Sequence, residues 1–331
     1  MDTSHPTWPG LFYRRQVLVY GAAAAAGAAA SAVLGAPTPA AGAVSPPLPS
    51  RLPAGGSSAL LTAERVRALN DAQGQELVAE FSIPSPVASW NFAESAAPYA
   101  SAVAGSPALQ QGRGSTATRI STPFGGGVQF NGTTDYLGVP RATVGTLNVG
   151  ATTGRVTVAS WVYSSDTNSA MIAGCWQESR TDPRRSYALF NDLPTYGGDD
   201  MVCMHVSKLG GPTPGYPFSI DYAAEPRKIT RGRWQFHVGT YDGAQAVAYL
   251  NGLASPYPYT DSTGATYSRN PYLYPHGLNA TATDFLVGVV KRDGSLINLH
   301  KGAIAKLRVW NSALTSAQVL ALYDAEKIAL G

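Results

Sequence analysis

The sequence has little charge and almost no cysteine. Charged residues make up 14% of the 331 residues, and the chain has two cysteines, five histidines and a formal net charge of +3. No long basic run is present, so the electrostatic surface that binds nucleic acids is not predicted. The histidines lack the spacing of zinc ligands, so no zinc site is predicted either.

Patterns of catalytic carboxylates are also scarce. Retaining glycosidases hold two carboxylates about 5 Å apart, and the one-strand arrangement Glu-x-Asp-x-Glu is absent from a chain with only seven glutamates. Gln235-Phe236-His237 resembles one strand of polysaccharide lyases, but their Arg-x-Glu-x-Arg strand is absent. We therefore predict that His237, and likewise His205, is a structural residue of a sheet. A carboxylate pair built from separate strands stays open as an alternative.

Glycine, proline and tyrosine are plentiful, with 35, 24 and 17 residues. The stretch Trp234–Gly252 alternates apolar and polar residues on either side of Asp242-Gly243, which predicts two antiparallel strands joined by a tight turn. Asn131-Gly132 predicts a second hairpin. Further short strands are predicted at Ala88–Phe92, Gly127–Phe130, Tyr136–Val139, Arg155–Tyr163, Met171–Trp176, Arg185–Phe190, Met201–Val206, Phe285–Val290 and Ala303–Trp310.

The end of the chain carries the signals of a helix start. Thr315 and Gln318 predict a capping box, and Leu314 and Val319 are spaced as its hydrophobic staple. We expect Val319, Leu320 and Tyr323 to dock this helix. Many short strands followed by one helix predict an all-β fold, an antiparallel β-sandwich of the jelly-roll kind with a short C-terminal helix.

The first 86 residues are predicted to precede the folded domain. Arg14-Arg15 and the alanine-rich run after them are typical of a signal peptide over residues 1–43, cleaved after Ala43, and resemble a bacterial twin-arginine signal. The alternative is a retained membrane anchor, since the apolar run is about 20 residues long. Residues 44–86 are predicted to be a Pro/Gly-rich linker with a short helix over Leu60–Asp71. We expect a secreted or cell-envelope bacterial protein with no membrane span after cleavage.

Several segments, taken in order, resemble a known family. They are Trp90-Asn91-Phe92, Val128–Pro140, Val156–Val162, Trp234–Gly243, Tyr249–Gly252 and Gly302–Val319. The set resembles bacterial laminin G-like domains of the concanavalin A-like jelly-roll group, over residues 87–331 with insertions at about 176–226 and 253–282. The resemblance implies two antiparallel sheets and a sugar-binding or calcium-assisted adhesive role.

The resemblance also bears on calcium. Family members commonly carry an acidic residue where this chain has Ala305, and calcium needs six to eight oxygen ligands, so this departure weakens the expectation of a calcium site. Asp135 is the residue that we predict as a metal ligand. The alternative role for Asp135 is to stabilise a turn.

The two insertions contain nine of the seventeen tyrosines, framed by proline and glycine. An aromatic ring can stack on the apolar face of a sugar while fixed polar groups read its hydroxyls. The alternative is that these tyrosines enlarge the core. The predicted ligand-binding residues are Trp176, Arg184, Arg185, Tyr196, Asp199, Asp200, Tyr216, Tyr222, Tyr257, Tyr259, Tyr272, Tyr274 and His276.

Cys175 and Cys203 are predicted on neighbouring segments. If the strand Arg185–Phe190 lies between them, they are about 9–10 Å apart, too far for a disulfide. A bridge would require another strand order, so free thiols are the favoured prediction.

The leading hypothesis is an exported, lectin-like protein that binds carbohydrate through the aromatic insertions. An enzyme acting on polysaccharide, either a hydrolase or a lyase, is the first alternative. A cell-surface module that recognises protein is the second.

Overall fold

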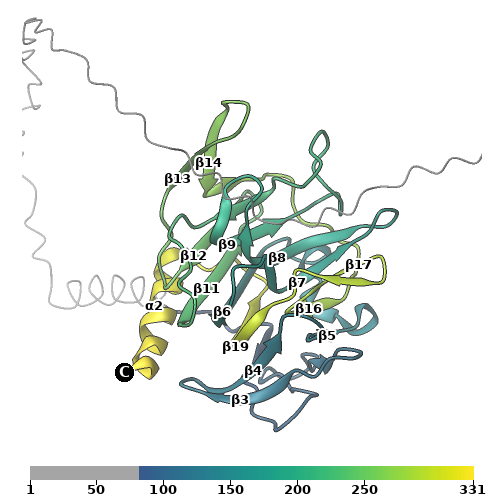
Figure 1. Cartoon of the computed structure of the whole chain (residues 1–331), viewed down its shortest axis with the longest axis vertical. Coiled ribbons are helices and arrows are strands. Elements are labelled where there is room, and N and C mark those ends of the chain that lie inside the picture. Colours follow the sequence, from purple (N-terminus) through teal and green to yellow (C-terminus); the bar gives the residue numbers. More distant parts are fainter. Residues whose placement is uncertain (1–81) are drawn as a thin grey trace, which may run out of the picture. The chain divides into compact units, whose positions relative to one another are not determined.

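The computed structural model describes residues 82–331, which form a sandwich of two large sheets (Figure 1). The first sheet has eight strands, in the order β15 (Tyr272–Leu273), β12 (Gln245–Leu250), β11 (Trp234–Tyr241), β6 (Val156–Ser164), β19 (Lys301–Trp310), β4 (Gly125–Asn131) and β3 (Thr118–Thr122), with β1 (Ala88–Trp90) also paired to β19.

The second sheet has nine strands. Its order is β10 (Tyr222–Ala224), β9 (Gly198–Val206), β8 (Arg184–Leu193), β7 (Ala170–Glu178), β16 (Phe285–Val287), β5 (Leu137–Val139) and β2 (Gln110–Gln111), with the hairpin of β17 (Val290–Arg292) and β18 (Ser295–Ile297) beside β7. All pairs are antiparallel except β17 with β7. The predicted fold class, an antiparallel β-sandwich, is confirmed.

Smaller elements complete this part of the chain. A two-stranded sheet of β13 (Tyr257–Thr260) and β14 (Thr266–Asn270) forms a separate hairpin (Figure 1). The helical elements of the described residues are α2 (Ser316–Lys327) and the 3-10 turns η1 (Arg141–Thr143), η2 (Gly145–Leu147), η3 (Val149–Ala151) and η4 (Ile328–Leu330).

The strand β6 shows why the sandwich has buried residues on both sides of a sheet. Val156, Val158 and Val162 face the second sheet, whereas Ala159 and Trp161 face outward. All five are buried, because α2 covers the outer side. The strand is therefore apolar on both of its faces.

The hairpin predicted at Trp234–Gly252 is confirmed as β11 and β12. Its turn is fixed by Asp242, whose Oδ1 accepts hydrogen bonds from the backbone N–H groups of Ala244 and Gln245, each at 2.8 Å. Gly243 has φ +99°, which a residue with a side chain rarely adopts.

The second predicted hairpin, at Asn131-Gly132, is wrong. β4 and β5 on either side of it belong to different sheets, so this turn carries the chain across the sandwich. Asn131 Oδ1 accepts hydrogen bonds from the backbone N–H groups of Thr133, Thr134 and Asp135. An Asn-Gly turn can join two strands of a hairpin or carry the chain from one sheet to the other, so local sequence does not distinguish the two kinds of connection.

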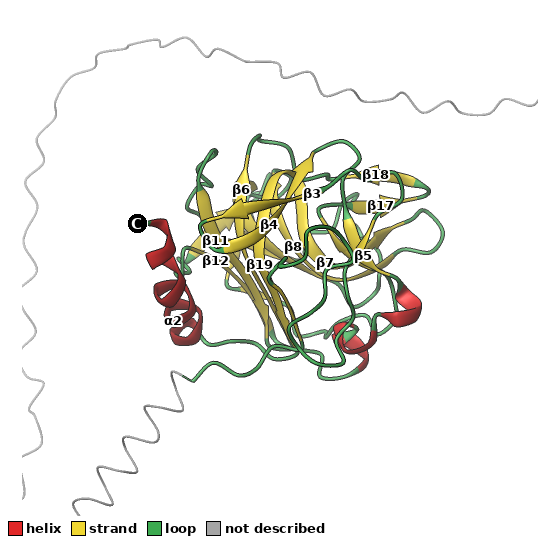
Figure 2. Ribbon diagram, turned by 90° about the horizontal axis from the view of Figure 1, so that it is seen from below, coloured by secondary structure: helices red, strands yellow, loops and turns green. Residues whose placement is uncertain are grey.

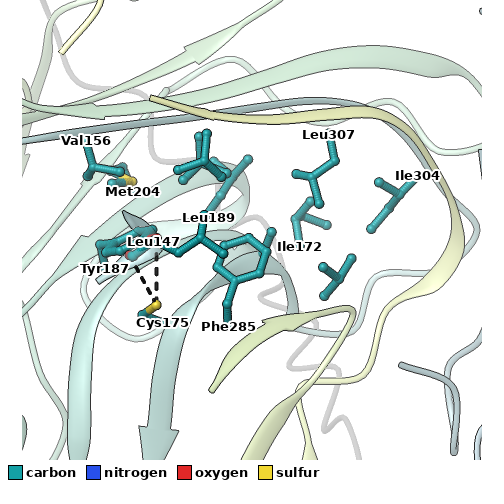
Figure 3. Close-up of a cluster of buried hydrophobic side chains, with 14 of the residues drawn as sticks. Leu147, Val156, Ile172, Cys175, Tyr187, Leu189, Met204, Phe285, Ile304 and Leu307 are labelled. Carbon is teal, nitrogen blue, oxygen red and sulfur yellow. Dashed lines mark hydrogen bonds between the residues drawn. The ribbon is translucent and has the colours of Figure 1, made fainter. Parts of the chain in front are cut away.

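The core between the sheets holds one of the two cysteines (Figure 3). Cys175 lies 3.7 Å from Tyr187 Oη, which donates a hydrogen bond to Leu147 O at 2.8 Å. Cys203 is buried on the opposite side of the nine-stranded sheet. Both thiols are free, as predicted, and burial raises the pKa of each to about 12.

The helix α2 lies on the outer face of the eight-stranded sheet, beside β11 and β12 (Figures 1 and 2). Its predicted capping box, Thr315 with Gln318, is confirmed. Val319 is fully buried, but Leu320 is 36% exposed, so the prediction that Leu320 docks the helix is wrong. Leu322 is buried instead, because it follows Val319 by three residues and so lies on the same face of the helix.

The chain enters the described domain on this same side. Ile83 packs with the residues under α2, Pro84 O accepts a hydrogen bond from Trp310 Nε1 at 2.7 Å, and Ser82 O accepts one from Gln318. The predicted signal peptide, most of the predicted linker and the helix over Leu60–Asp71 lie outside the described residues. Within residues 82–331, no helix has the length and apolar character needed to cross a membrane.

Candidate functional site

The outer face of the nine-stranded sheet carries a floor of aromatic rings. Strand alternation turns Trp176 of β7, Phe190 of β8, His205 of β9 and Tyr222 of β10 away from the core between the sheets. The His205 ring lies 4.4 Å from that of Trp176 and 5.3 Å from that of Tyr222, between ring centroids. Four neighbouring strands therefore place four rings together on one surface.

A polar network crosses this floor. Glu178 Oε1 accepts a hydrogen bond from Trp176 Nε1 at 2.9 Å, and Glu178 Oε2 accepts one from Arg185 Nε at 3.0 Å and another from Arg185 Nη2. The pairing register of β7 and β8 sets Arg185 opposite Trp176, beyond an irregularity between Cys175 and Trp176. Arg185 is 7% exposed, and its Nη1 has no hydrogen-bond partner in the described structure.

His205 is a second incompletely paired group. Its side chain is 7% exposed, and its Nε2 has no hydrogen-bond partner among residues 82–331. Burial, reinforced by the charges of Arg185 and Arg269, holds the pKa of His205 well below its usual value. At neutral pH the ring is uncharged, with one nitrogen that donates a hydrogen bond and one that accepts.

A cavity of about 410 Å³ lies over these groups. One wall is the loop 207–221, from which Pro217, Phe218 and Ser219 contribute, and another includes Arg292 and Asn298. Phe218 is 61% exposed, so its ring stands at the rim in solvent. We call this space the Trp176 cavity. Among its lining residues in the described structure, Glu178 supplies the one carboxylate, whereas a two-carboxylate hydrolytic mechanism needs a partner.

The same loop borders a second cavity, of about 460 Å³, which we call the Tyr274 cavity. It brings together Tyr272, Tyr274 and His276, three of the predicted site residues, with Leu209 and Asp221. Asp221 Oδ2 accepts hydrogen bonds from Ser219 at 3.0 Å and from Thr213, so its polar contacts are internal. Loop 207–221 thus separates two cavities.

Most tyrosines of the second insertion surround one buried cation, Arg269. This side chain is fully buried, and its Nη1 donates to the carbonyl oxygens of Ile220 and Tyr222 at 2.6 and 2.9 Å. Its guanidinium lies 4.4–5.4 Å from the centroids of the rings of Tyr222, Tyr259, Tyr267 and Tyr272. No carboxylate in the described residues forms an ion pair with Arg269. These tyrosines therefore fit the alternative of an enlarged core.

The remaining predicted ligand-binding residues are not among those that line the Trp176 cavity. Three of them form ion pairs: Arg184 with Asp182, Asp199 with Lys228, and Asp200 with Arg231. Two more contact each other, since the rings of Tyr196 and Tyr216 are 5.9 Å apart in an edge-to-face arrangement. Tyr257 packs against the outer cluster of the nine-stranded sheet.

Asp135 makes protein contacts through both of its carboxylate oxygens. Oδ1 accepts hydrogen bonds from the backbone N–H and the hydroxyl of Thr116 at 2.6 and 3.0 Å, and Oδ2 accepts one from Asn131 N–H at 3.0 Å. No group of three or more His, Cys, Asp or Glu side chains in residues 82–331 is arranged to hold a metal ion. The geometry of Asp135 fits the turn-stabilising alternative, and a calcium site there stays a prediction.

Among the residues that line the Trp176 cavity, the sequence predicted Trp176, Arg185 and Tyr222 as ligand-binding residues but not His205, Glu178 or Phe218. His205 was predicted to be structural, and its place beside Trp176 depends on the register of three strands. Phe218 stands in the proline-framed segment Gly210–Phe218, where tyrosines alone were chosen. His237 lies between the sheets, outside the Trp176 cavity, with Nδ1 2.9 Å from Asn191 Oδ1. Its Nε2, like that of His205, has no hydrogen-bond partner among residues 82–331.

Comparison with known proteins identifies the family. The family described as the concanavalin A-like lectin/glucanases superfamily matches residues 131–320. No curated protein matches the sequence.

Solved structures with a similar fold include domain 4 of AbnA, an extracellular GH43 arabinanase from Geobacillus stearothermophilus, in complex with arabinotriose. It has 16% identity and a TM-score of 0.47, over 72% of this chain and 98% of that one. The ligand-binding domain of botulinum neurotoxin serotype D, in complex with N-acetylneuraminic acid, has 11% identity and a TM-score of 0.46, over 73% of this chain and 51% of that one.

The Trypanosoma rangeli sialidase in complex with 2,3-difluorosialic acid has 14% identity and a TM-score of 0.48, over 80% of this chain and 39% of that one. This chain therefore spans about half of the toxin domain and well under half of the sialidase. Likenesses this distant assign no ligand to the present chain.

Proposed function

Since the chain belongs to the concanavalin A-like lectin/glucanases superfamily, we propose that it is a carbohydrate-binding protein whose site is the Trp176 cavity. Family membership fixes the fold and not the ligand. The observation that carries the proposal is the combination, in one cavity, of aromatic rings with two buried polar groups that have no hydrogen-bond partner within residues 82–331, Arg185 Nη1 and His205 Nε2.

A sugar matches both features of the cavity. Its hydroxyls donate and accept hydrogen bonds, so they can pair with a guanidinium N–H and with either nitrogen of a neutral imidazole. A buried polar atom without a partner costs about 1–3 kcal/mol, and a ligand that supplies the partner recovers part of this cost. The apolar face of a pyranose can stack on Phe218 at the rim. The volume of about 410 Å³ lies within the usual range of small-ligand sites.

The test uses Phe218→Ala with Leu273→Ala as its matched control. Both side chains are mostly exposed, at 61% and 70%, so neither change should alter folding, but Leu273 lines the Tyr274 cavity. On a glycan array, and by calorimetry with the best glycan, Phe218→Ala should lose about tenfold in affinity. Leu273→Ala should bind like the unchanged protein.

Two results would contradict the proposal. One is a folded protein that binds no glycan of the array. The other is an affinity loss in Leu273→Ala but not in Phe218→Ala, which would move the site to the Tyr274 cavity. Tyr222→Ala is a poor probe, because Tyr222 is buried and its Oη donates to the carbonyl oxygens of Leu193 and Thr195.

We also propose that the protein is exported, on the strength of Arg14-Arg15 and the alanine-rich run that follows them. The test is to express the full chain in a bacterial host and to sequence the N-terminus of the extracytoplasmic product. A new terminus at Val44 is the expected result, and replacing both arginines with lysine should block export. Recovery of the uncleaved chain only from the cytoplasm would refute this proposal.

A further inference from the structure

The Trp176 cavity is surrounded by more positive than negative charge. Arg185 and Arg292 line it, and the fully buried Arg269 lies directly behind one of its walls, with its guanidinium 4.4 Å from the centroid of the Tyr222 ring. Against these three cations stands one carboxylate among the lining residues, Glu178, which is paired with Arg185. Neither Arg292 nor Arg269 forms an ion pair within the described residues, so two of these three cations have no carboxylate partner there.

These two cations differ in their access to a ligand. Arg269 contacts carbonyl oxygens, tyrosine rings and the Tyr267 hydroxyl, to which its Nη2 donates, so it contributes a fixed field from behind the wall. Arg292, at the end of β17, is exposed and forms no ion pair in the described structure. Its guanidinium is free to bind an anion directly. Asp221, the nearest acidic residue on the loop, belongs to the Tyr274 cavity and is engaged by Ser219 and Thr213.

The state of His205 is consistent with this field. The charges of Arg185 and Arg269 add to burial in lowering the pKa of its imidazole, so the ring stays neutral beside them. Within a partly enclosed cavity the effective dielectric constant is below that of water, and the field of Arg269 is weakly screened.

We infer that the sugar bound in this cavity carries an acidic group, a carboxylate or a sulfate, which pairs with Arg292 at the rim while the ring and hydroxyls of the same saccharide contact the floor. This inference rests on the proposed carbohydrate-binding function. A guanidinium binds both kinds of anion through paired N–H groups, and such charge-assisted hydrogen bonds are stronger than neutral ones.

The experiment compares matched glycans. An array that carries neutral glycans beside their uronate-bearing and sulfated counterparts should retain the protein on the acidic members, and calorimetry should give about tenfold tighter binding than for the neutral counterpart. The uronate and sulfate arms distinguish the two sources of the negative charge. Raising the salt concentration from about 0.05 to 0.5 M should weaken acidic binding several-fold, because it shortens the screening length.

The matched variants are Arg292→Gln and Arg155→Gln. Each removes one exposed arginine that forms no ion pair with another described residue, and of the two only Arg292 lines the cavity. Arg292→Gln should lose about tenfold in affinity for the acidic glycan and little for the neutral one, while Arg155→Gln should change neither.

The outcomes separate this inference from the function on which it rests. Equal binding of neutral and acidic counterparts would overturn the acidic ligand and leave carbohydrate binding standing. A protein that binds no glycan of either kind would overturn both. Retention of acidic glycans that Arg292→Gln does not weaken would also overturn the assigned contact.

Discussion

The two outer faces of the sandwich carry the same trio of residue types and use it differently. On the eight-stranded sheet, Trp161 Nε1 and Arg308 both donate to Glu326 Oε2, each at 2.8 Å. On the nine-stranded sheet, Trp176 and Arg185 both donate to Glu178. The difference lies in the origin of the glutamate. Glu326 comes from the covering helix α2, whereas Glu178 comes from β7 itself, two residues after the tryptophan.

This difference is reflected in what lies over each tryptophan: α2 covers Trp161, whereas the Trp176 cavity lies over Trp176. The carboxylate of α2 must cross to the sheet to reach Trp161 and Arg308, so the network ties the helix down. On the other face the network is complete within two adjacent strands, so nothing has to cover it. The same set of Trp, Arg and Glu hydrogen bonds thus holds a helix against the sheet on one face and lines a candidate binding site on the other.

The largest expected effect on the free energy of unfolding comes from the interior between the two sheets, not from either outer face. Burial lowers the pKa of His237 to about 3 and that of His300 to about 4, against about 6.5 for an unfolded histidine. As the pH falls below about 6.5, the unfolded chain binds protons that the folded chain excludes, so the free energy of unfolding decreases. Down to pH 4 the loss should be about 3 kcal/mol for each histidine.

The measurement is the denaturant midpoint between pH 7 and pH 4. His237→Gln should show a shallower decline over this range, whatever its stability at pH 7. A variant whose pH dependence runs parallel to that of the unchanged protein would show that His237 does not contribute to it.

The second test removes Trp161, the tryptophan on the face that α2 covers. Trp161 is fully buried, with its ring 4.2 Å from that of Phe124 and 5.9 Å from that of Tyr323 on α2, between centroids. Trp161→Ala should lower the free energy of unfolding by about 3–5 kcal/mol and make α2 sensitive to protease. Glycan binding by the remaining folded protein should be unchanged. Protease resistance of α2 in this variant would break the view that the network fastens the helix.

The third test compares the two glutamates directly. Glu326→Gln leaves two cations, Arg308 and Lys306, without their partner, while Glu178→Gln leaves only Arg185. We expect a loss of about 2 kcal/mol in the free energy of unfolding for Glu326→Gln and about 1 kcal/mol for Glu178→Gln. Only Glu178→Gln should alter glycan affinity. Identical effects of the two changes on both stability and binding would erase the contrast between the faces.

The smallest expected effect concerns the start of the covering helix. Thr315 Oγ1 accepts a hydrogen bond from Gln318 N–H at 3.2 Å, and Gln318 Oε1 accepts one from Thr315 N–H at 2.9 Å. Thr315→Ala removes the cap and should cost about 1 kcal/mol, measured by thermal or chemical unfolding. Thr152→Ala, at an exposed residue that caps no α-helix and whose hydroxyl donates a hydrogen bond to Val149 O at 3.3 Å, is a control that should cost less.

The sequence predicted the elements better than it predicted the relations between them. Strand alternation identified β6, β11 and β12 correctly, because side-chain period is a local property. The connection after Asn131 was predicted wrongly, since one turn chemistry serves both a hairpin and a crossover between sheets. The capping box was readable, but the docking role of Leu320 was not, because it depends on how the helix is rotated on the sheet.

The candidate site shows the same limit. Trp176, Arg185 and Tyr222 could be selected by residue type, but the network that they form depends on the strand register beyond the irregularity at Cys175. Tyrosine density pointed to the second insertion, where the rings instead surround Arg269, a residue that residue type alone did not single out. Long-range pairing thus decides which aromatic rings face a cavity and which enclose a cation.

The entry of the chain beside α2 has a consequence for how the domain is presented. Ser82 and Pro84 are held against the face that α2 covers, and the Trp176 cavity opens on the opposite face of the sandwich. The described part of the chain therefore begins on the side of the sandwich that faces away from the candidate site, so a molecule approaching the cavity does not meet Ser82 or Pro84.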